Sequence, residues 1–178
     1  MTTIVAYQGE GFAILGADSQ ITDGDKRILS PSTSKITKIG KYLLAVSGDC
    51  RPGDILMYLW KPPAYDGTDA VKFVGRKIIP SIIGAFKAQG YDYTKDSASY
   101  SYLLAFNGNI FEIGDELSIS QSSDGIYGVG SGSPYAMGYM ASIKGEVGKE
   151  QILQALKVSA KYDINTAAPF QIEVQKRI

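Results

Sequence analysis

Histidine is absent from this 178-residue sequence, and its absence excludes several kinds of active site at once. A Ser-His-Asp triad, a Cys-His nucleophile pair and the usual histidine-rich zinc sites all need imidazole. Only one cysteine, Cys50, is present, so no disulfide forms within the chain, and a reducing, cytoplasmic environment is expected. If the protein is an enzyme, its general base is another kind of group.

Long apolar runs and net charge are missing as well. No apolar run approaches the roughly 18 residues of a membrane span, and the N-terminus lacks the basic and apolar segments of a signal peptide. Lys+Arg and Asp+Glu each number 18, so neither nucleic acid nor an anionic membrane is expected as a partner. The length and the ordinary apolar content predict a single domain over residues 1–178.

The expected elements occur in the order strands, two helices, strands, two helices, strand. Asn107-Gly108 between two apolar runs predicts a hairpin turn, and Pro80 predicts a kink or break in a helix beginning near Thr68 or Asp69. Segregated blocks of this kind favour an α+β layered domain. Strands are expected at 3–7, 12–17, 35–39, 42–46, 101–106, 109–113, 126–129 and 170–174, and helices at 54–60, from about 68 with an apolar face of Val71, Val74, Ile78, Ile82 and Phe86, at about 133–143 and at about 149–162.

The N-terminal sequence Met1-Thr2-Thr3 offers a base that needs no histidine. Threonine is small enough for the initiator methionine to be removed in front of it, which leaves a hydroxyl and a free α-amine on Thr2. An α-amine has a pKa of about 7.7–8.0, so much of it is unprotonated near neutrality. Threonine with its own amine is a recognised nucleophile–base pair. On these residues alone, however, the start of an ordinary strand explains the sequence better.

Further segments occur in a fixed order along nearly the whole chain. They are Thr2-Thr3-Ile4-Val5, Gly16-Ala17-Asp18-Ser19, Ser34-Lys35-Ile36, Ala45-Val46-Ser47-Gly48, Gly130-Ser131-Gly132-Ser133-Pro134-Tyr135-Ala136 and Tyr162-Asp163-Ile164-Asn165-Thr166. Each is weak alone, but together they resemble the proteasome β-subunit family, including its bacterial HslV-type branch. The resemblance implies a four-layer αββα sandwich of the N-terminal nucleophile hydrolase type. The start at Met-Thr-Thr is closer to HslV and the Gly-Ser-Gly segment to a proteasome β subunit, so the branch stays open.

The resemblance also implies roles for individual residues. The Thr2 hydroxyl attacks the scissile carbonyl, and its amine accepts the proton. Lys35 lowers the pKa values of that amine and hydroxyl, although by spacing alone a solvated strand lysine is the preferred explanation. Asp18 pairs with Lys35, where a turn or cap residue is the plain alternative. The backbone N–H of Gly48 binds the developing oxyanion, in a loop where glycine is also ordinary.

Three more residues complete the implied site. Ser131 relays protons near the N-terminal amine, with a flexible turn as its alternative reading. Asp163 and Thr166 orient the N-terminal residue, and their spacing of three suits one helical turn. Threonine replaces the family's serine at Thr166, which adds a methyl group. Cys50 has no histidine to activate it and is expected to be a small buried side chain, near the substrate pocket at most.

The implied function is that of a threonine endopeptidase inside stacked homo-oligomeric rings, acting on unfolded polypeptide. The resemblance also implies an ATP-driven unfoldase as a partner, because the enclosed chamber admits only unfolded chain. The sequence has no nucleotide-binding motif of its own, so ATP hydrolysis would belong to that partner. No cofactor or metal is expected. Two alternatives remain: a non-catalytic or unprocessed ring subunit with an assembly role, and a small-molecule amidohydrolase of the same fold.

Overall fold

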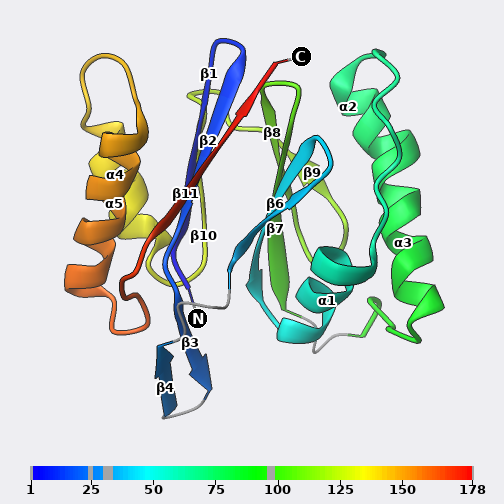
Figure 1. Ribbon diagram of the computed structural model, residues 1–178, viewed down its shortest axis with the longest axis horizontal. Helices are drawn as coiled ribbons and strands as arrows, with labels where there is room; N and C mark the ends of the chain where they lie inside the picture. The colour runs from blue at the N-terminus through cyan, green and yellow to red at the C-terminus, as the bar shows by residue number, and fades with distance from the viewer. Residues whose placement is uncertain (1, 24–25, 30–33, 96–98, 178) are drawn as a thin grey trace.

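Helices and sheets form four layers in the order helices, sheet, sheet, helices (Figure 1). The computed structural model describes residues 2–23, 26–29, 34–95 and 99–177. One outer layer holds α4 (Ser133–Ala141) and α5 (Lys149–Tyr162). The other holds α1 (Cys50–Asp54), α2 (Ala70–Phe73) and α3 (Ile79–Ala88). These layers have the αββα order that the sequence predicts.

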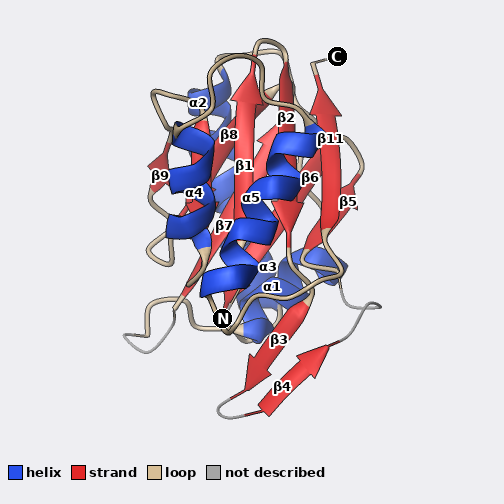
Figure 2. Ribbon diagram, turned by 90° about the vertical axis from the view of Figure 1, so that its left-hand side faces the viewer, coloured by secondary structure: helices blue, strands red, loops and turns tan. Residues whose placement is uncertain are grey.

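The first sheet is antiparallel, with strand order β10-β1-β2-β11. Successive side chains of a strand point to opposite faces, so Ile4 and Ala6 join the apolar cluster between the sheets while Val5 packs beneath the helices. Figure 2 shows α4 and α5 lying across this outer face. The strands are β1 (Ile4–Gly9), β2 (Phe12–Ala17), β10 (Ile126–Val129) and β11 (Gln171–Lys176).

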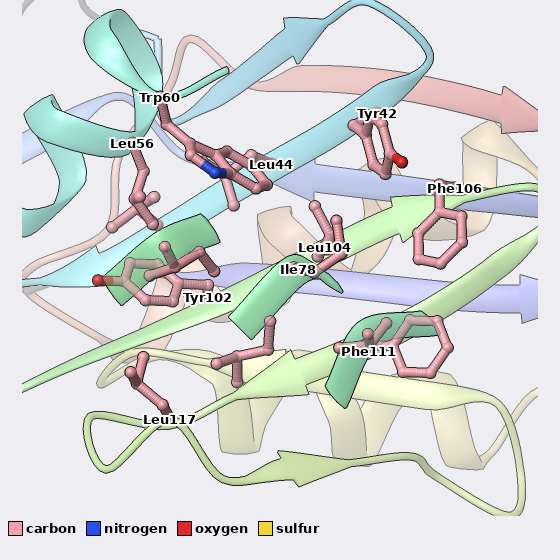
Figure 3. Close-up of a cluster of buried hydrophobic side chains, with 14 of the residues drawn as sticks. Tyr42, Leu44, Leu56, Trp60, Ile78, Tyr102, Leu104, Phe106, Phe111 and Leu117 are labelled. Carbon is pink, nitrogen blue, oxygen red and sulfur yellow. The ribbon is translucent and has the colours of Figure 1, made fainter. Parts of the chain in front are cut away.

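The second sheet alternates in the same way and carries the larger aromatic core. Leu43 and Ala45 face the first sheet, whereas Tyr42 and Leu44 belong to the cluster under α1–α3 (Figure 3). At its β7–β8 turn, Asn107 and Gly108 both have positive φ, 50° and 74°, as the predicted hairpin requires. The strands, in order, are β5 (Ile36–Ile39), β6 (Tyr42–Gly48), β7 (Tyr100–Phe106), β8 (Asn109–Ile113) and β9 (Ile119–Ser120).

The helices after β6 differ from the predicted ones because both contain a π-helical segment. The expected helix at 54–60 starts earlier, as α1, and continues as η1 (Ile55–Leu59). The next helix begins after Asp69, whose side chain accepts a hydrogen bond from the Lys72 backbone N–H at 3.0 Å, and it passes through η2 (Val74–Ile78) into α3.

The prediction that Val71 shares the apolar face of this helix is wrong, because Val71 is 49% exposed while Val74, Ile78, Ile82 and Phe86 are buried. A π-helical segment winds the chain more widely than an α-helix, so residues before it leave the expected face. Pro80 lies in the first turn of α3, directly after that segment. The chain stays helical from Ala70 to Ala88, so Pro80 does not divide the helix in two; its missing N–H and its crowding of the preceding turn coincide with the change from π-helical to α-helical winding.

A two-stranded hairpin was not predicted. It consists of β3 (Gln20–Asp23) and β4 (Lys26–Leu29), which pair with each other. Figures 1 and 2 show it extending beyond the four layers at the end where the chain begins. The short β9 was also missed. Separately, no helix in the described part of the chain is long and apolar enough to cross a membrane.

Candidate active site

The register of the first sheet brings three distant segments to one end of the sandwich. Ile4 of β1 pairs with Ala17 of β2 on one side and with Val129 of β10 on the other. The residues before Ile4 therefore lie between the segment after Ala17, which holds Asp18, and the turn after Val129, which holds Ser131. Sheet pairing alone thus brings together Thr2, Asp18 and Ser131, which are far apart in sequence.

Asp18 is only 1% exposed, and both of its oxygens are fully engaged. Oδ1 accepts from the Thr3 backbone N–H at 2.9 Å and from Lys35 Nζ at 2.6 Å. Oδ2 accepts from the backbone N–H groups of Gln20 at 2.9 Å and Ala167 at 3.3 Å. A buried carboxylate is tolerated when it is paired and hydrogen-bonded in this way, and Asp18 thereby fixes the chain just after Thr2.

Lys35 lies just before β5 and is also buried. Its Nζ donates to Asp18 Oδ1 and to the Gln20 backbone carbonyl, both at 2.6 Å. Burial lowers the pKa of Lys35, while the charges of Asp18 and Asp163 partly oppose that shift. The site therefore holds a cation whose proton is less tightly bound than that of an ordinary lysine.

Thr2, Lys35 and Gly48 line one pocket of about 120 Å³, together with Gln20 and Cys50 among others. Gly48 ends β6 with φ of +104°, and a Cβ there would lie 2.2 Å from the Ser99 carbonyl oxygen. Only glycine fits this position. In the described part of the chain, no three or more Cys, Asp or Glu side chains converge as metal ligands.

The sequence-based prediction for Cys50 is wrong in one respect, its burial. It was expected to be buried, but it is exposed at the start of α1. It begins a helix one residue after the end of β6, and its exposed side chain lines a pocket and does not belong to the apolar core. Its predicted location near the substrate pocket agrees with its place in the pocket lining.

The Gly130-Ser131-Gly132 turn packs directly against the first residues of the chain. The Gly132 backbone N–H donates to the Thr2 carbonyl oxygen at 3.3 Å. A Cβ at Gly130 would lie 2.2 Å from that same oxygen, and one at Gly132 would lie 1.9 Å from Thr3 Oγ1. The two glycines thus permit a backbone approach that any side chain would block, so this segment is more than a flexible turn.

Asp163 directly follows the last residue of α5 and accepts hydrogen bonds from neutral donors. Its Oδ2 accepts from Thr166 Oγ1 at 2.6 Å and from Ser131 Oγ at 3.0 Å, and its Oδ1 accepts from the Asn165 backbone N–H at 3.2 Å. Burial raises the pKa of Asp163, but these hydrogen bonds outweigh that effect and leave the pKa below its ordinary value. The structure therefore brings Ser131, Asp163 and Thr166 into one cluster.

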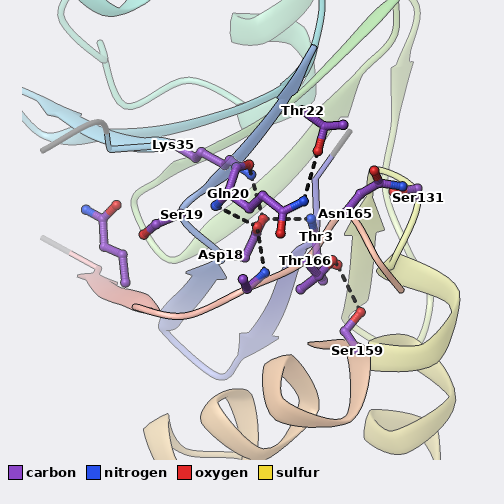
Figure 4. Close-up of polar contacts among 12 residues, drawn as sticks. Thr3, Asp18, Ser19, Gln20, Thr22, Lys35, Ser131, Ser159, Asn165 and Thr166 are labelled. Atoms are coloured by element: carbon purple, nitrogen blue, oxygen red, sulfur yellow. Dashed lines mark hydrogen bonds and ion pairs between the residues drawn. The ribbon is translucent and has the colours of Figure 1, made fainter. Parts of the chain in front are cut away.

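Sequence reasoning missed the hydroxyl groups that connect this cluster to β1. Thr3 Oγ1 lies 2.5 Å from Thr166 Oγ1 and 2.9 Å from Ser159 Oγ, and Ser159 Oγ donates to the Gly132 carbonyl (Figure 4). A signal was available in the sequence, because Ser159 lies on the helix face of Ile152 and Leu156, which is otherwise apolar and buried. A buried polar residue on such a face needs a hydrogen-bond partner.

Comparison with known proteins shows which proteins this chain resembles. Residues 1–56 match the family described as "Proteasome subunit". The chain is 26% identical to the ATP-dependent protease subunit HslV of Campylobacter hominis, over 93% of this chain and 91% of that protein. The resemblance to the proteasome and HslV family is confirmed.

Solved structures confirm the predicted fold of this proteasome-like chain. It superposes with a TM-score of 0.77 on Thiobacillus denitrificans BPH in complex with epoxomicin, at 22% identity, covering 99% of this chain and 100% of that one. It superposes with a TM-score of 0.72 on eukaryotic HslV from Trypanosoma brucei, at 17% identity and with the same coverage. Both matches span the whole αββα sandwich.

Proposed function

We propose that the protein is a threonine endopeptidase of the proteasome and HslV type, with residues 1–178 forming one peptidase domain. The observation that carries the proposal is the buried ion pair between Lys35 and Asp18, because Lys35 lines the same pocket as Thr2. A buried charge pair is costly to maintain. A catalytic role explains why this ion pair is present, because Lys35 lines the same pocket as the potential N-terminal nucleophile Thr2.

The nucleophile in this mechanism is Thr2 Oγ1, freed for reaction when Met1 is removed. The liberated α-amine accepts the hydroxyl proton as the Thr2 oxygen attacks the scissile carbonyl carbon. The resulting tetrahedral intermediate collapses when the amide C–N bond breaks, and the amine's proton passes to the leaving nitrogen. An ester between Thr2 and the acyl part of the substrate remains, and a water molecule hydrolyses it with the amine again as base.

Lys35 and Asp18 provide the charges that act on the Thr2 amine and hydroxyl in this step. A cation beside the amine and hydroxyl favours their unprotonated forms, so more of the amine is ready to act as a base near neutral pH. Asp18 holds the ammonium in place through a 2.6 Å contact. The backbone N–H of Gly48, at the end of β6 in the pocket lining, is assigned to the oxyanion, for which one such donor contributes about 2.7–4 kcal/mol.

Ser131, Asp163 and Thr166 are assigned to the orientation of the N-terminal residue. Their cluster reaches Thr3 through the contact between the Thr166 and Thr3 hydroxyls, and it reaches Thr2 through the turn that carries Ser131. Ser131 is the member placed to relay a proton, because its hydroxyl already donates to Asp163. Fixing the nucleophile within a fraction of an ångström is worth a large part of the rate.

The assembly and partners are proposed from the family alone. We assign the chain to stacked rings that enclose the active sites in the cytoplasm, and to unfolded polypeptide as substrate. An ATP-driven unfoldase would deliver that substrate. The Campylobacter hominis relative is named an ATP-dependent protease subunit. Analytical ultracentrifugation tests the assembly: a ring-sized species supports it, and a stable monomer at micromolar concentration contradicts it.

Activity is tested by comparing wild type with Thr2→Ala and Thr2→Ser on an unfolded protein substrate. Loss of the hydroxyl in Thr2→Ala should reduce kcat/KM by about a thousandfold or more, as removal of a nucleophile does in other hydrolases. Thr2→Ser keeps a hydroxyl beside the amine and is the matched control, which should retain measurable turnover. Hydrolysis by Thr2→Ala at the wild-type rate would move the chemistry to another residue.

A further inference from the structure

Gln20 carries a buried acceptor that has no partner among the described residues. The residue is 1% exposed, and its Oε1 is buried without a hydrogen bond. The orientation of its amide is fixed by its neighbours. Nε2 donates to the Ile164 carbonyl oxygen at 2.9 Å and to Thr22 Oγ1 at 3.0 Å, and a carbonyl can only accept. Flipping the amide would therefore place two acceptors against each other.

An unpaired buried acceptor in a native protein calls for an explanation. Gln20 lies in the pocket that Thr2 also lines. The Asp18 carboxylate binds one backbone N–H group on each side. Its Oδ1 accepts from Thr3 and its Oδ2 accepts from Gln20, each at 2.9 Å. Thr2 and Gln20 are thereby fixed on either side of Asp18 (Figure 4 shows Thr3, Asp18 and Gln20).

Removal of Met1 adds donors to the Thr2 nitrogen, in a residue that lines the same pocket as Gln20. The Thr2 nitrogen carries one N–H in the Met1–Thr2 peptide bond, two as a neutral amine and three as an ammonium. We propose that Gln20 Oε1 accepts a hydrogen bond from the liberated Thr2 amine, which makes Gln20 a positioning residue for the base. The inference rests on the proposed function. With one N–H held on Gln20, the amine's lone pair is free to face the Thr2 hydroxyl.

The backbone and side chain of Gln20 also join the two halves of the site. Its carbonyl oxygen accepts from Lys35 Nζ at 2.6 Å, while its Nε2 holds Ile164, the residue after Asp163. The charged and titratable groups that these contacts adjoin are Asp18 and Lys35 on one side, and Asp163 next to Ile164 on the other. From α1 and the residue before it come Asp49, Cys50 and Asp54, which line the pocket.

Two variants of similar size separate this role from a structural one. Gln20→Met and Gln20→Glu both lose the Nε2 donors to Ile164 and Thr22, and glutamate additionally places an acceptor oxygen against the Ile164 carbonyl. They differ at the position of Oε1, because methionine offers no comparable acceptor whereas glutamate adds a negative charge. The acid limb of the pH profile of kcat/KM reports the pKa of the base in the free enzyme.

The expected shifts of this limb have opposite signs. Glutamate favours the ammonium form and moves the acid limb to higher pH by about one unit, while methionine withdraws an acceptor from the ammonium and moves the limb to lower pH by a smaller amount. Methionine should also lower kcat by about tenfold or more, because the base is less well oriented. Thr22→Val is the matched control. It removes one Nε2 partner and leaves Oε1 unchanged, so its acid limb should stay at the wild-type pH.

The proposal is overturned if both Gln20 variants shift the limb in one direction, if neither shifts it, or if Thr22→Val shifts it as Gln20→Met does. Wild type must first form a covalent adduct on Thr2, and absence of that adduct is a failure of the proposed function instead. If a variant does not fold, a crystal structure of the wild-type protein without Met1 tests the proposal instead. It should place Oε1 about 2.7–3.2 Å from the Thr2 nitrogen, and a different partner or none at Oε1 would overturn the proposal.

Discussion

Asp18 and Asp163 are two buried carboxylates in the same polar network, but the protein stabilises their charges differently. Asp18 is 1% exposed and faces the ammonium of Lys35 as well as three backbone N–H groups. Asp163 is 8% exposed and takes its hydrogen bonds from hydroxyls and amides. In the first arrangement burial lowers the pKa of Lys35 although the charge of Asp18 opposes that shift, whereas in the second a carboxylate is held by neutral donors alone.

The largest effect should come from breaking the charged pair. Asp18→Ala leaves Lys35 buried without a counter-ion, and such losses cost about 3–5 kcal/mol of stability. Urea unfolding measures this, with the double variant Asp18→Ala/Lys35→Met as the control. In this double variant the unpaired Lys35 charge is also removed, so part of the lost stability should be recovered. A cost below about 1 kcal/mol for Asp18→Ala would show that the pair is not as buried as described.

Asp163→Asn should cost less, because it leaves no opposite charge without a partner. The amide keeps one acceptor oxygen but turns a donor toward hydroxyls that now donate to a carboxylate, which predicts a loss of about 1–3 kcal/mol. The same urea titration applies. If Asp163→Asn proves as costly as Asp18→Ala, the contrast between the two carboxylates fails.

The pH dependence of stability should distinguish wild type from Asp163→Asn. The pKa of Asp163 is lower in the folded protein than its ordinary value, so its contribution is fully present above the unfolded-state pKa of about 3.9 and is lost as pH falls through the folded-state pKa. Unfolding free energies measured from pH 6 down to about pH 2 should fall less steeply for Asp163→Asn. Parallel curves would contradict the lowered pKa.

The smallest effect concerns Thr166, which replaces the serine expected from the family. Thr166→Ser keeps the hydroxyl that contacts Thr3 and Asp163 and removes one buried methyl, so it should cost about 1 kcal/mol and retain activity. Thr166→Val keeps the shape and removes the hydroxyl, and should cost about 1–3 kcal/mol and lower activity. If valine is tolerated better than serine in both measurements, the hydroxyl has no orienting role.

Sequence patterns predicted the elements whose signals are local. The bounds of α5 and the turn at Asn107-Gly108 follow from apolar periodicity and from a turn that needs positive φ. The exposure of Val71 did not follow, because a π-helical segment shifts the helical phase without a clear signature in composition. The β3–β4 hairpin was missed because its strands are only four residues long and pair with each other.

The residues that form the candidate site could be predicted from the sequence better than the hydrogen bonds between them. The ordered segments identified the residues that sheet pairing then brings together, from Thr2 and Asp18 to Ser131. The hydrogen bonds of Thr3, Ser159 and Gln20 depend on side chains meeting across four layers, which no single segment encodes.

The most direct test is the intact mass of the native protein before and after treatment with a threonine-reactive covalent inhibitor. We expect a chain that lacks Met1 and gains one inhibitor adduct, with peptide mapping locating the adduct on Thr2 and none forming on Thr2→Ala. Quantitative retention of Met1 together with the absence of any adduct on Thr2 would contradict the assignment of Thr2 as the nucleophile.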